Sequence, residues 1–145
     1  MSIVAAVDSS GATASVLARA IRQARQAGAS LQVIHVYEPP TVTYSMAGIH
    51  ELDDGRLAEA EAEAVWGGAS PVLDDSGIDW VRHDARGYPP TAIADFAKEV
   101  DADLIVIGSR GKGAFLSLAL GSTSHGVLHR AGCDVVVVRN HSGDI

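Results

Sequence analysis

Residues 104–124 read LIVIGSRGKGAFLSLALGSTS, and their pattern indicates the fold class. Its first four residues, 104–107, form an apolar run typical of a short strand that is buried on both faces. A glycine-rich loop follows at once, and the segment GSTS at 121–124 opens a helix predicted over residues 122–129. A further apolar run at 135–138 predicts another strand. Strand, loop, helix and strand in this order indicate a βαβ unit of a parallel sheet.

The rest of the chain repeats this alternation. Apolar runs predict three more strands, at residues 3–7, 31–37 and 78–83, with helical patterns between them. We therefore expect an α/β fold with a five-stranded parallel sheet, doubly wound so that helices cover both faces in three layers. Ligands of such sheets bind beyond the carboxyl ends of the strands, where the strand order reverses. Functional residues are expected just after the strands.

The first predicted helix has recognisable ends. Apolar residues at helical spacing begin near residue 14, and Gly28 lies where a glycine would end the helix. Ser9 or Ser10 is expected to cap its start. Asp8, at the end of the first strand, is a second candidate for this capping role.

The segment from residue 41 to residue 76 is expected to be the least regular. Its apolar spacing predicts a helix that begins near Asp53. Gly67, Gly68 and Pro71 fall inside that helix, and these residue types weaken or break helices. We expect an interrupted or weak helix here.

Length and composition limit the class of protein. At 145 residues the chain can form one domain with its own core, predicted over residues 1–140 with a short C-terminal tail at 141–145. A net charge of −7 makes nucleic acid an unfavourable partner. One cysteine, Cys133, cannot form a disulfide framework, and no apolar run approaches the ~20 residues of a membrane span. Without a recognisable signal peptide, a cytoplasmic location is expected, with no membrane partner.

The loop after the strand at 104–107 has the composition of a phosphate site. Residues 108–114 contain three glycines, one serine hydroxyl and two cations. Glycine lets backbone N–H groups approach an anion closely, and Arg110 and Lys112 add opposite charge. The helix that opens at 121–124 offers further N–H groups and a favourable dipole. The spacing fits neither a GxGxxG fingerprint nor a Walker A loop.

At these residues the sequence resembles the universal stress protein family, and the resemblance covers nearly the whole chain. The nucleotide signature of that family, G-x2-G-x9-G-[ST], is matched by Gly108, Gly111, Gly121 and Ser122 without a gap. The resemblance implies a Rossmann-like fold of the adenine nucleotide alpha hydrolase type, with strand order 3-2-1-4-5. That order would place Asp8 opposite the Gly108 loop.

The resemblance also implies a ligand and the residues that hold it. The ligand would be ATP or ADP, accompanied by Mg²⁺, and no metal ligands are assigned. Adenine and ribose would lie along Ala6, Asp8 and the backbone near Val36. The phosphates would be held by Gly108, Ser109, Arg110, Gly111, Lys112, Gly121, Ser122, Thr123 and Ser124. A homodimer through the last strand is implied as well, since an apolar edge strand invites pairing.

Three functions remain open at this point. The favoured one is an ATP-binding, nucleotide-responsive regulator of stress or dormancy physiology with at most slow ATP hydrolysis, because no dedicated catalytic set stands out. The protein partner of such a regulator is not identified. The second is an α/β enzyme of nucleotidyl transfer or phosphate hydrolysis with Asp8 as metal ligand or base. The third is a nucleotide-free dimeric scaffold.

Two further features are interpreted as structural. His125 and His129 are four residues apart on a predicted helix, but no third ligand accompanies them, so we expect structural or solvent-facing side chains rather than a metal site. Cys133 precedes an apolar strand and is expected to be an inert buried thiol.

Overall fold

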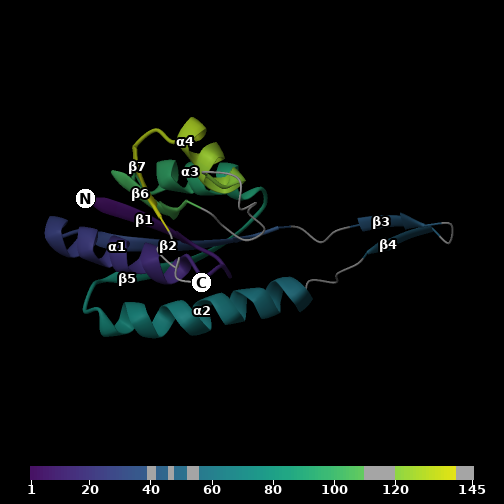
Figure 1. The fold of residues 1–145 in the computed structure, drawn as a ribbon, viewed down its shortest axis with the longest axis horizontal. Coiled ribbons are helices and arrows are strands. Elements are labelled where there is room, and N and C mark those ends of the chain that lie inside the picture. Colours follow the sequence, from purple (N-terminus) through teal and green to yellow (C-terminus); the bar gives the residue numbers. More distant parts are fainter. Residues whose placement is uncertain (39–41, 46–47, 52–55, 110–119, 140–145) are drawn as a thin grey trace.

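The computed structural model describes residues 1–38, 42–45, 48–51, 56–109 and 120–139. Figure 1 shows a central sheet covered by helices on both faces, with a two-stranded hairpin lying apart from it. The elements in chain order are β1 (Ser2–Val7), α1 (Thr13–Ala27), β2 (Ser30–Tyr37), β3 (Val42–Ser45), β4 (Gly48–Glu51), α2 (Arg56–Asp75), β5 (Trp80–Arg86), α3 (Pro89–Glu99), β6 (Leu104–Gly108), α4 (Ser122–Arg130) and β7 (Asp134–Val138). Within the described residues, no helix is both long and apolar enough for a membrane span.

The main sheet is parallel, with the strand order β5-β2-β1-β6-β7. Counted along the chain within this sheet, the order is 3-2-1-4-5, so the expected fold class and topology are confirmed. The order reverses between β1 and β6, which pair side by side with Ala5 opposite Val106. The residues that follow these two strands therefore lie at the position where ligands bind in folds of this kind.

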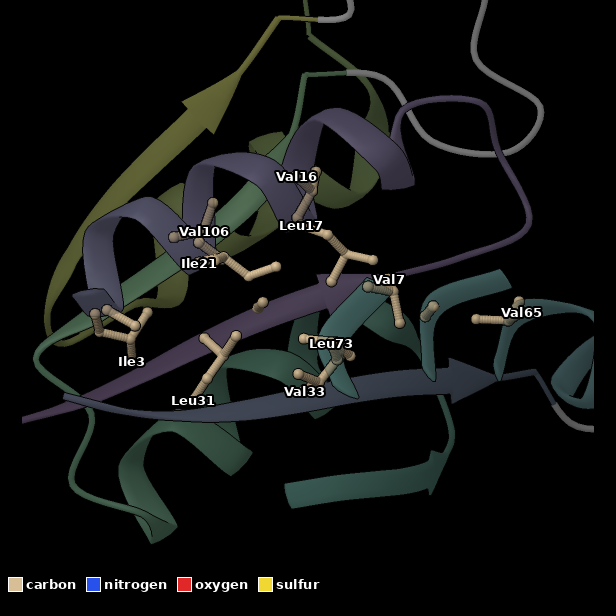
Figure 2. Close-up of a cluster of buried hydrophobic side chains, with 14 of the residues drawn as sticks. Ile3, Val7, Val16, Leu17, Ile21, Leu31, Val33, Val65, Leu73 and Val106 are labelled. Atoms are coloured by element: carbon tan, nitrogen blue, oxygen red, sulfur yellow. The ribbon is translucent and has the colours of Figure 1, made fainter. Parts of the chain in front are cut away.

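Two apolar layers hold the helices on the sheet. On one face, α1 and α2 pack through buried side chains such as Leu17 and Leu73, which point toward the strands in Figure 2. On the other face, α3 and α4 pack around Ile93 and its neighbours. Successive residues of β2 serve different layers, since Val33 belongs to the first and Ile34 to the second. This is the pleat of a strand that is buried on both sides.

Helix α1 ends where the sequence predicts, but its start is not capped as expected. Gly28 follows the helix in the left-handed conformation with φ 62°, and its N–H donates to the Ala24 carbonyl. The N-cap residue is Ala12, which has no side-chain cap, so the assignment of Ser9 or Ser10 to that role was wrong. The Ser10 hydroxyl instead accepts the N–H of Ala12 itself, before the first helical residue.

Helix α2 is unbroken over 20 residues, so the interruption expected at Gly67, Gly68 and Pro71 does not occur. A helical glycine costs about 1 kcal/mol relative to alanine and a proline about 3 kcal/mol. Burial of one large apolar side chain returns about 1.5–3 kcal/mol. The helix buries several side chains, namely Val65, Trp66, Ala69 and Leu73. Tertiary packing therefore outweighs the poor local propensity.

Other boundaries agree with the sequence to different degrees. The strands predicted at 3–7, 31–37, 104–107 and 135–138 and the helix at 122–129 match the structure to within one residue at each end. The strand predicted at 78–83 lies at Trp80–Arg86, because its pairing with β2 continues past the apolar run. The predicted tail at 141–145 lies outside the described residues.

Candidate functional site

Gly108 and Gly121, one residue from each half of the glycine motif, are linked through Ser109 at the end of β6. Ser109 follows this strand and is 7% exposed. Its N–H donates to the Val138 carbonyl of β7 at 2.8 Å, and its own carbonyl accepts the N–H of Gly121 at 2.6 Å. The start of α4 is thus bonded directly to the residue after Gly108. Arg110, Gly111 and Lys112, which are part of the predicted phosphate site, lie outside the described residues.

Ser124 reinforces this junction from inside α4. Its side chain is 2% exposed. The hydroxyl lies 3.1 Å from the Ser109 carbonyl oxygen and 3.0 Å from that of Gly121. A hydroxyl has a single proton, and here that proton is directed at backbone oxygens. This geometry fixes α4 against β6, and a contact of Ser124 with phosphate stays a prediction.

The first turn of α4 presents groups that suit an anion. The helix begins at Ser122, and its N-cap Gly121 contributes no side-chain cap. The N–H of His125 makes the first bond of the helix, to the Gly121 carbonyl at 3.0 Å. The N–H groups of residues 122–124 therefore precede the helical ladder, where the helix dipole favours negative charge. Ser122 is exposed and Thr123 is half-buried, so their hydroxyls belong to the accessible part of this turn.

The residues predicted to contact adenine and ribose lie at the carboxyl ends of two neighbouring strands, Ala6 and Asp8 at the end of β1 and Val36 at the end of β2. Ala6 and Val36 are half-buried and pack against the apolar layer that also contains α4. Asp8 comes directly after β1 and is half-buried. The structure therefore places Ala6 and Val36 on the face of the sheet where α4 begins, and Asp8 at the crossover point between β1 and β6.

Asp8 is held in a hydrogen-bonded turn. Its carboxylate Oδ1 accepts the N–H of Ser10 at 2.8 Å. Because the side chain of Asp8 accepts the N–H two residues further on, the bond forms an Asx turn. Ser10 lies before the N-cap residue Ala12, so Asp8 does not cap α1. The hydroxyl of Thr13 accepts the Asp8 N–H at 3.1 Å and donates to the Asp8 carbonyl at 2.7 Å. Thr13 was not predicted as a site residue, although a hydroxyl residue at the start of a helix beside Asp8 was a usable signal.

His35 supports the same turn from β2. Its side chain is 1% exposed, and its Nδ1 lies 3.2 Å from the Val7 carbonyl oxygen. A carbonyl can only accept, so Nδ1 carries the proton of this bond. Its Nε2 is buried without a hydrogen-bond partner in the part of the chain that the structure describes. The last peptide of β1 is thus fixed from the neighbouring strand.

The two histidines of α4 and the cysteine take no part in this site. His125 and His129 are exposed, with their ring centroids 4.6 Å apart in an edge-to-face arrangement, which confirms the solvent-facing interpretation. Among described residues there is no group of three or more His, Cys, Asp or Glu that could hold a metal ion. Cys133 is half-buried rather than buried. Burial, followed by the charges of Asp134 and Asp103, raises the pKa of its thiol, which disfavours the reactive thiolate.

Residues 1–139 match the model of the universal stress protein family. The Bacillus subtilis protein named universal stress protein YxiE is 32% identical over 144 residues, which span 94% of this chain and 97% of the relative. The solved structure of UspA from Lactobacillus plantarum has a TM-score of 0.76 at 28% identity and covers 96% of this chain and 97% of its own. A universal stress protein from Archaeoglobus fulgidus, solved in complex with dAMP, has a TM-score of 0.69 at 28% identity, with 95% and 97% covered.

Proposed function

Because the chain belongs to the universal stress protein family, we propose that it binds an adenine nucleotide, ATP or ADP, at the carboxyl edge of its sheet. One observation carries this proposal. The bond between the Gly121 N–H and the Ser109 carbonyl brings the start of α4 to the end of β6, the strand that pairs with β1. The dAMP complex of the Archaeoglobus relative supports adenine nucleotides as the ligand class.

The proposed ligand runs across the crossover point between β1 and β6. Adenine and ribose lie along Ala6, Asp8 and Val36, on the face that α4 also covers. The phosphates lie at the first turn of α4, where N–H groups and the helix dipole favour anions. The residues proposed to hold them are Gly108, Ser109, Arg110, Gly111, Lys112, Gly121, Ser122, Thr123 and Ser124.

Magnesium fits this site as a companion of the phosphates. Because the described residues offer no cluster of three or more metal-ligating side chains, the protein alone would supply few ligands. Mg²⁺ commonly takes one or two protein oxygens together with phosphate oxygens and water. Asp8 and Ser122 are the candidates for those protein oxygens, and the ion would neutralise phosphate charge. A carboxylate such as Asp8 repels bare phosphate, so it needs the ion or a ribose hydroxyl as its partner.

We propose a cytoplasmic regulator that responds to nucleotide and hydrolyses ATP slowly at most. Bound nucleotide would favour one arrangement of the surface around the Gly108 loop, and a protein partner would recognise that arrangement. The alternative of a nucleotide-processing enzyme predicts many rapid turnovers of Mg-ATP by the purified protein. If such turnover is measured, the regulator hypothesis is wrong and the protein is an enzyme. The alternative of a nucleotide-free scaffold predicts no binding at all.

The edge strand β7 is the proposed dimer contact. It stands at one end of the sheet order and pairs with β6 on its inner side. Four consecutive valines, 135–138, are half-buried in the single chain, and an apolar edge of this kind favours pairing with another strand. Sedimentation should give a particle of twice the 15.0 kDa chain mass. A single species at the mass of one chain would contradict the dimer.

Mass spectrometry of the small molecules that copurify with the protein tests the ligand directly. The protein is purified without added nucleotide, denatured, and its supernatant analysed. ATP, ADP or AMP in near-stoichiometric amount supports the proposal. A stoichiometric ligand without an adenine base would overturn it.

A further inference from the structure

We propose that Thr13 is a positioning residue for nucleotide binding, because its hydroxyl fixes the geometry of Asp8. This inference rests on the proposed function, in which Asp8 contacts the ribose or the metal ion. The Thr13 Oγ1 lies 3.1 Å from the Asp8 nitrogen, 2.7 Å from its carbonyl oxygen and 3.4 Å from its carboxylate Oδ1. One hydroxyl therefore touches the backbone on both sides of the Asp8 side chain and the side chain itself.

The chemistry of a hydroxyl matches this set of contacts. It has one proton to donate and two lone pairs to accept. One lone pair accepts the Asp8 N–H, and the proton points to the Asp8 carbonyl, which is the shortest of the three contacts. The same proton can instead point to the carboxylate Oδ1 of Asp8, which is the longer contact. A methyl group in place of the hydroxyl would lose all of these interactions.

Helix α1 makes Thr13 a rigid support. Thr13 is the first residue of the helix, and the N-cap position is occupied by Ala12. The next turn is anchored in the core by Val16 and Leu17, which are 2% and 1% exposed. The Thr13 hydroxyl is thus held by the core and directed at the preceding turn.

Two further contacts support Asp8 and the turn that holds it. His35, itself buried, donates from Nδ1 to the carbonyl of Val7, the residue before Asp8. The N–H of Ser10 donates to the Asp8 carboxylate at 2.8 Å. The turn after β1 is therefore bonded from α1, from β2 and from within. A carboxylate that is already in place loses less conformational freedom when a ligand binds, which raises affinity.

The test compares Thr13→Val, which keeps the size of the side chain and removes its hydroxyl, with Thr13→Ser, which keeps the hydroxyl. Affinity for Mg-ATP and for AMP is measured by calorimetry, and folding is checked by circular dichroism and thermal melting. Thr13→Val should bind about tenfold more weakly, roughly the effect of losing one hydrogen bond. Thr13→Ser should stay near the wild type. Thr91→Val is the matched control, because Thr91 also lies in the first turn of its helix.

A double-mutant cycle separates positioning from general stability. If Thr13 acts through Asp8, Thr13→Val should change affinity by less than about twofold in an Asp8→Ala background. An equal loss in both backgrounds, or wild-type affinity of folded Thr13→Val, would overturn the inference. If Thr13→Val does not fold, Thr13→Ala is measured in its place. If neither variant folds, Thr13 is needed for folding, and the inference of a positioning role is overturned. If the wild type binds no adenine nucleotide, the proposed function fails first, and this inference fails with it.

Discussion

The backbone N–H of Gly121 donates a hydrogen bond to the carbonyl oxygen of Ser109 at 2.6 Å. This bond joins the end of β6 to the start of α4. The buried Ser124 hydroxyl adds contacts of 3.1 Å to the Ser109 carbonyl and 3.0 Å to the Gly121 carbonyl. The start of α4 is therefore positioned by the end of the strand that precedes it. In our proposal, this junction is where the phosphates of the nucleotide bind.

Gly121→Val should abolish ATP binding, because a branched side chain would occupy the space through which phosphate approaches the backbone. Gly121 has φ −73°, a conformation that valine also adopts, so backbone strain is not expected. Calorimetry with Mg-ATP is the measurement, with circular dichroism to confirm folding. Gly68→Val, on the exposed side of α2, is the matched control. Unchanged affinity of Gly121→Val would refute the proposed phosphate site.

Gly126→Ala should destabilise the protein by about 1–3 kcal/mol, the usual cost of overpacking. An added Cβ at Gly126 would lie 2.6 Å from the Cβ and 2.9 Å from the Cγ of Pro90. Because the proline ring is rigid, α3 and α4 would have to separate. The measurement is the free energy of unfolding in urea.

Gly68→Ala provides the opposite case for that experiment. An added Cβ at Gly68 meets nothing within 4 Å, and the residue lies inside α2. Alanine should therefore stabilise the protein by about 0.5–1 kcal/mol through its higher helix propensity. A Gly126→Ala protein as stable as the Gly68→Ala protein would show that α3 and α4 do not approach as closely as described.

Asp84 should contribute stability that disappears in acid. Burial alone would raise the pKa of Asp84. Hydrogen bonds from Arg82 and Trp66, both at 2.8 Å, lower the pKa by more than burial raises it, so it lies below its ordinary value. A carboxyl group with a depressed folded-state pKa stabilises the protein above its unfolded pKa of about 3.9 and loses this contribution as the pH falls through the folded value. The carboxylate side chain is 33% exposed, so the effect should stay below about 1 kcal/mol.

Urea unfolding of Asp84→Asn at pH 7 and at pH 3 tests this prediction. The variant should be less stable than the wild type at pH 7, and the difference should shrink at pH 3, because the unfolded wild-type chain already binds a proton at Asp84 there. A stability difference that is the same at both pH values would show that the charge of Asp84 is not involved.

Local pattern was sufficient for most of the sheet. Strands such as β6 are short apolar runs because both of their faces are buried, and Ile105 and Val106 are both fully buried. The motif residues Gly108 and Gly121 were also recognisable, since their spacing is visible along the chain. The hydrogen bond between the Gly121 N–H and the Ser109 carbonyl could not be predicted from the sequence, because it depends on how α4 packs on the sheet.

Features that depend on tertiary contacts were missed. The continuity of α2 through Pro71 follows from burial of Trp66 and Leu73 against the sheet, which propensity does not include. The role of Thr13 depends on a turn that brings its hydroxyl back to Asp8. The hairpin of β3 and β4 was hidden in a segment expected to be irregular.

The decisive test of adenine nucleotide binding is calorimetric titration of the purified wild-type protein with ATP and ADP in the presence of Mg²⁺, with GTP as the control for the base. We predict saturable binding of adenine nucleotide at one site per chain, and weaker binding of GTP. Absence of saturable binding by both adenine nucleotides, in protein shown to be folded and free of copurified ligand, would contradict it.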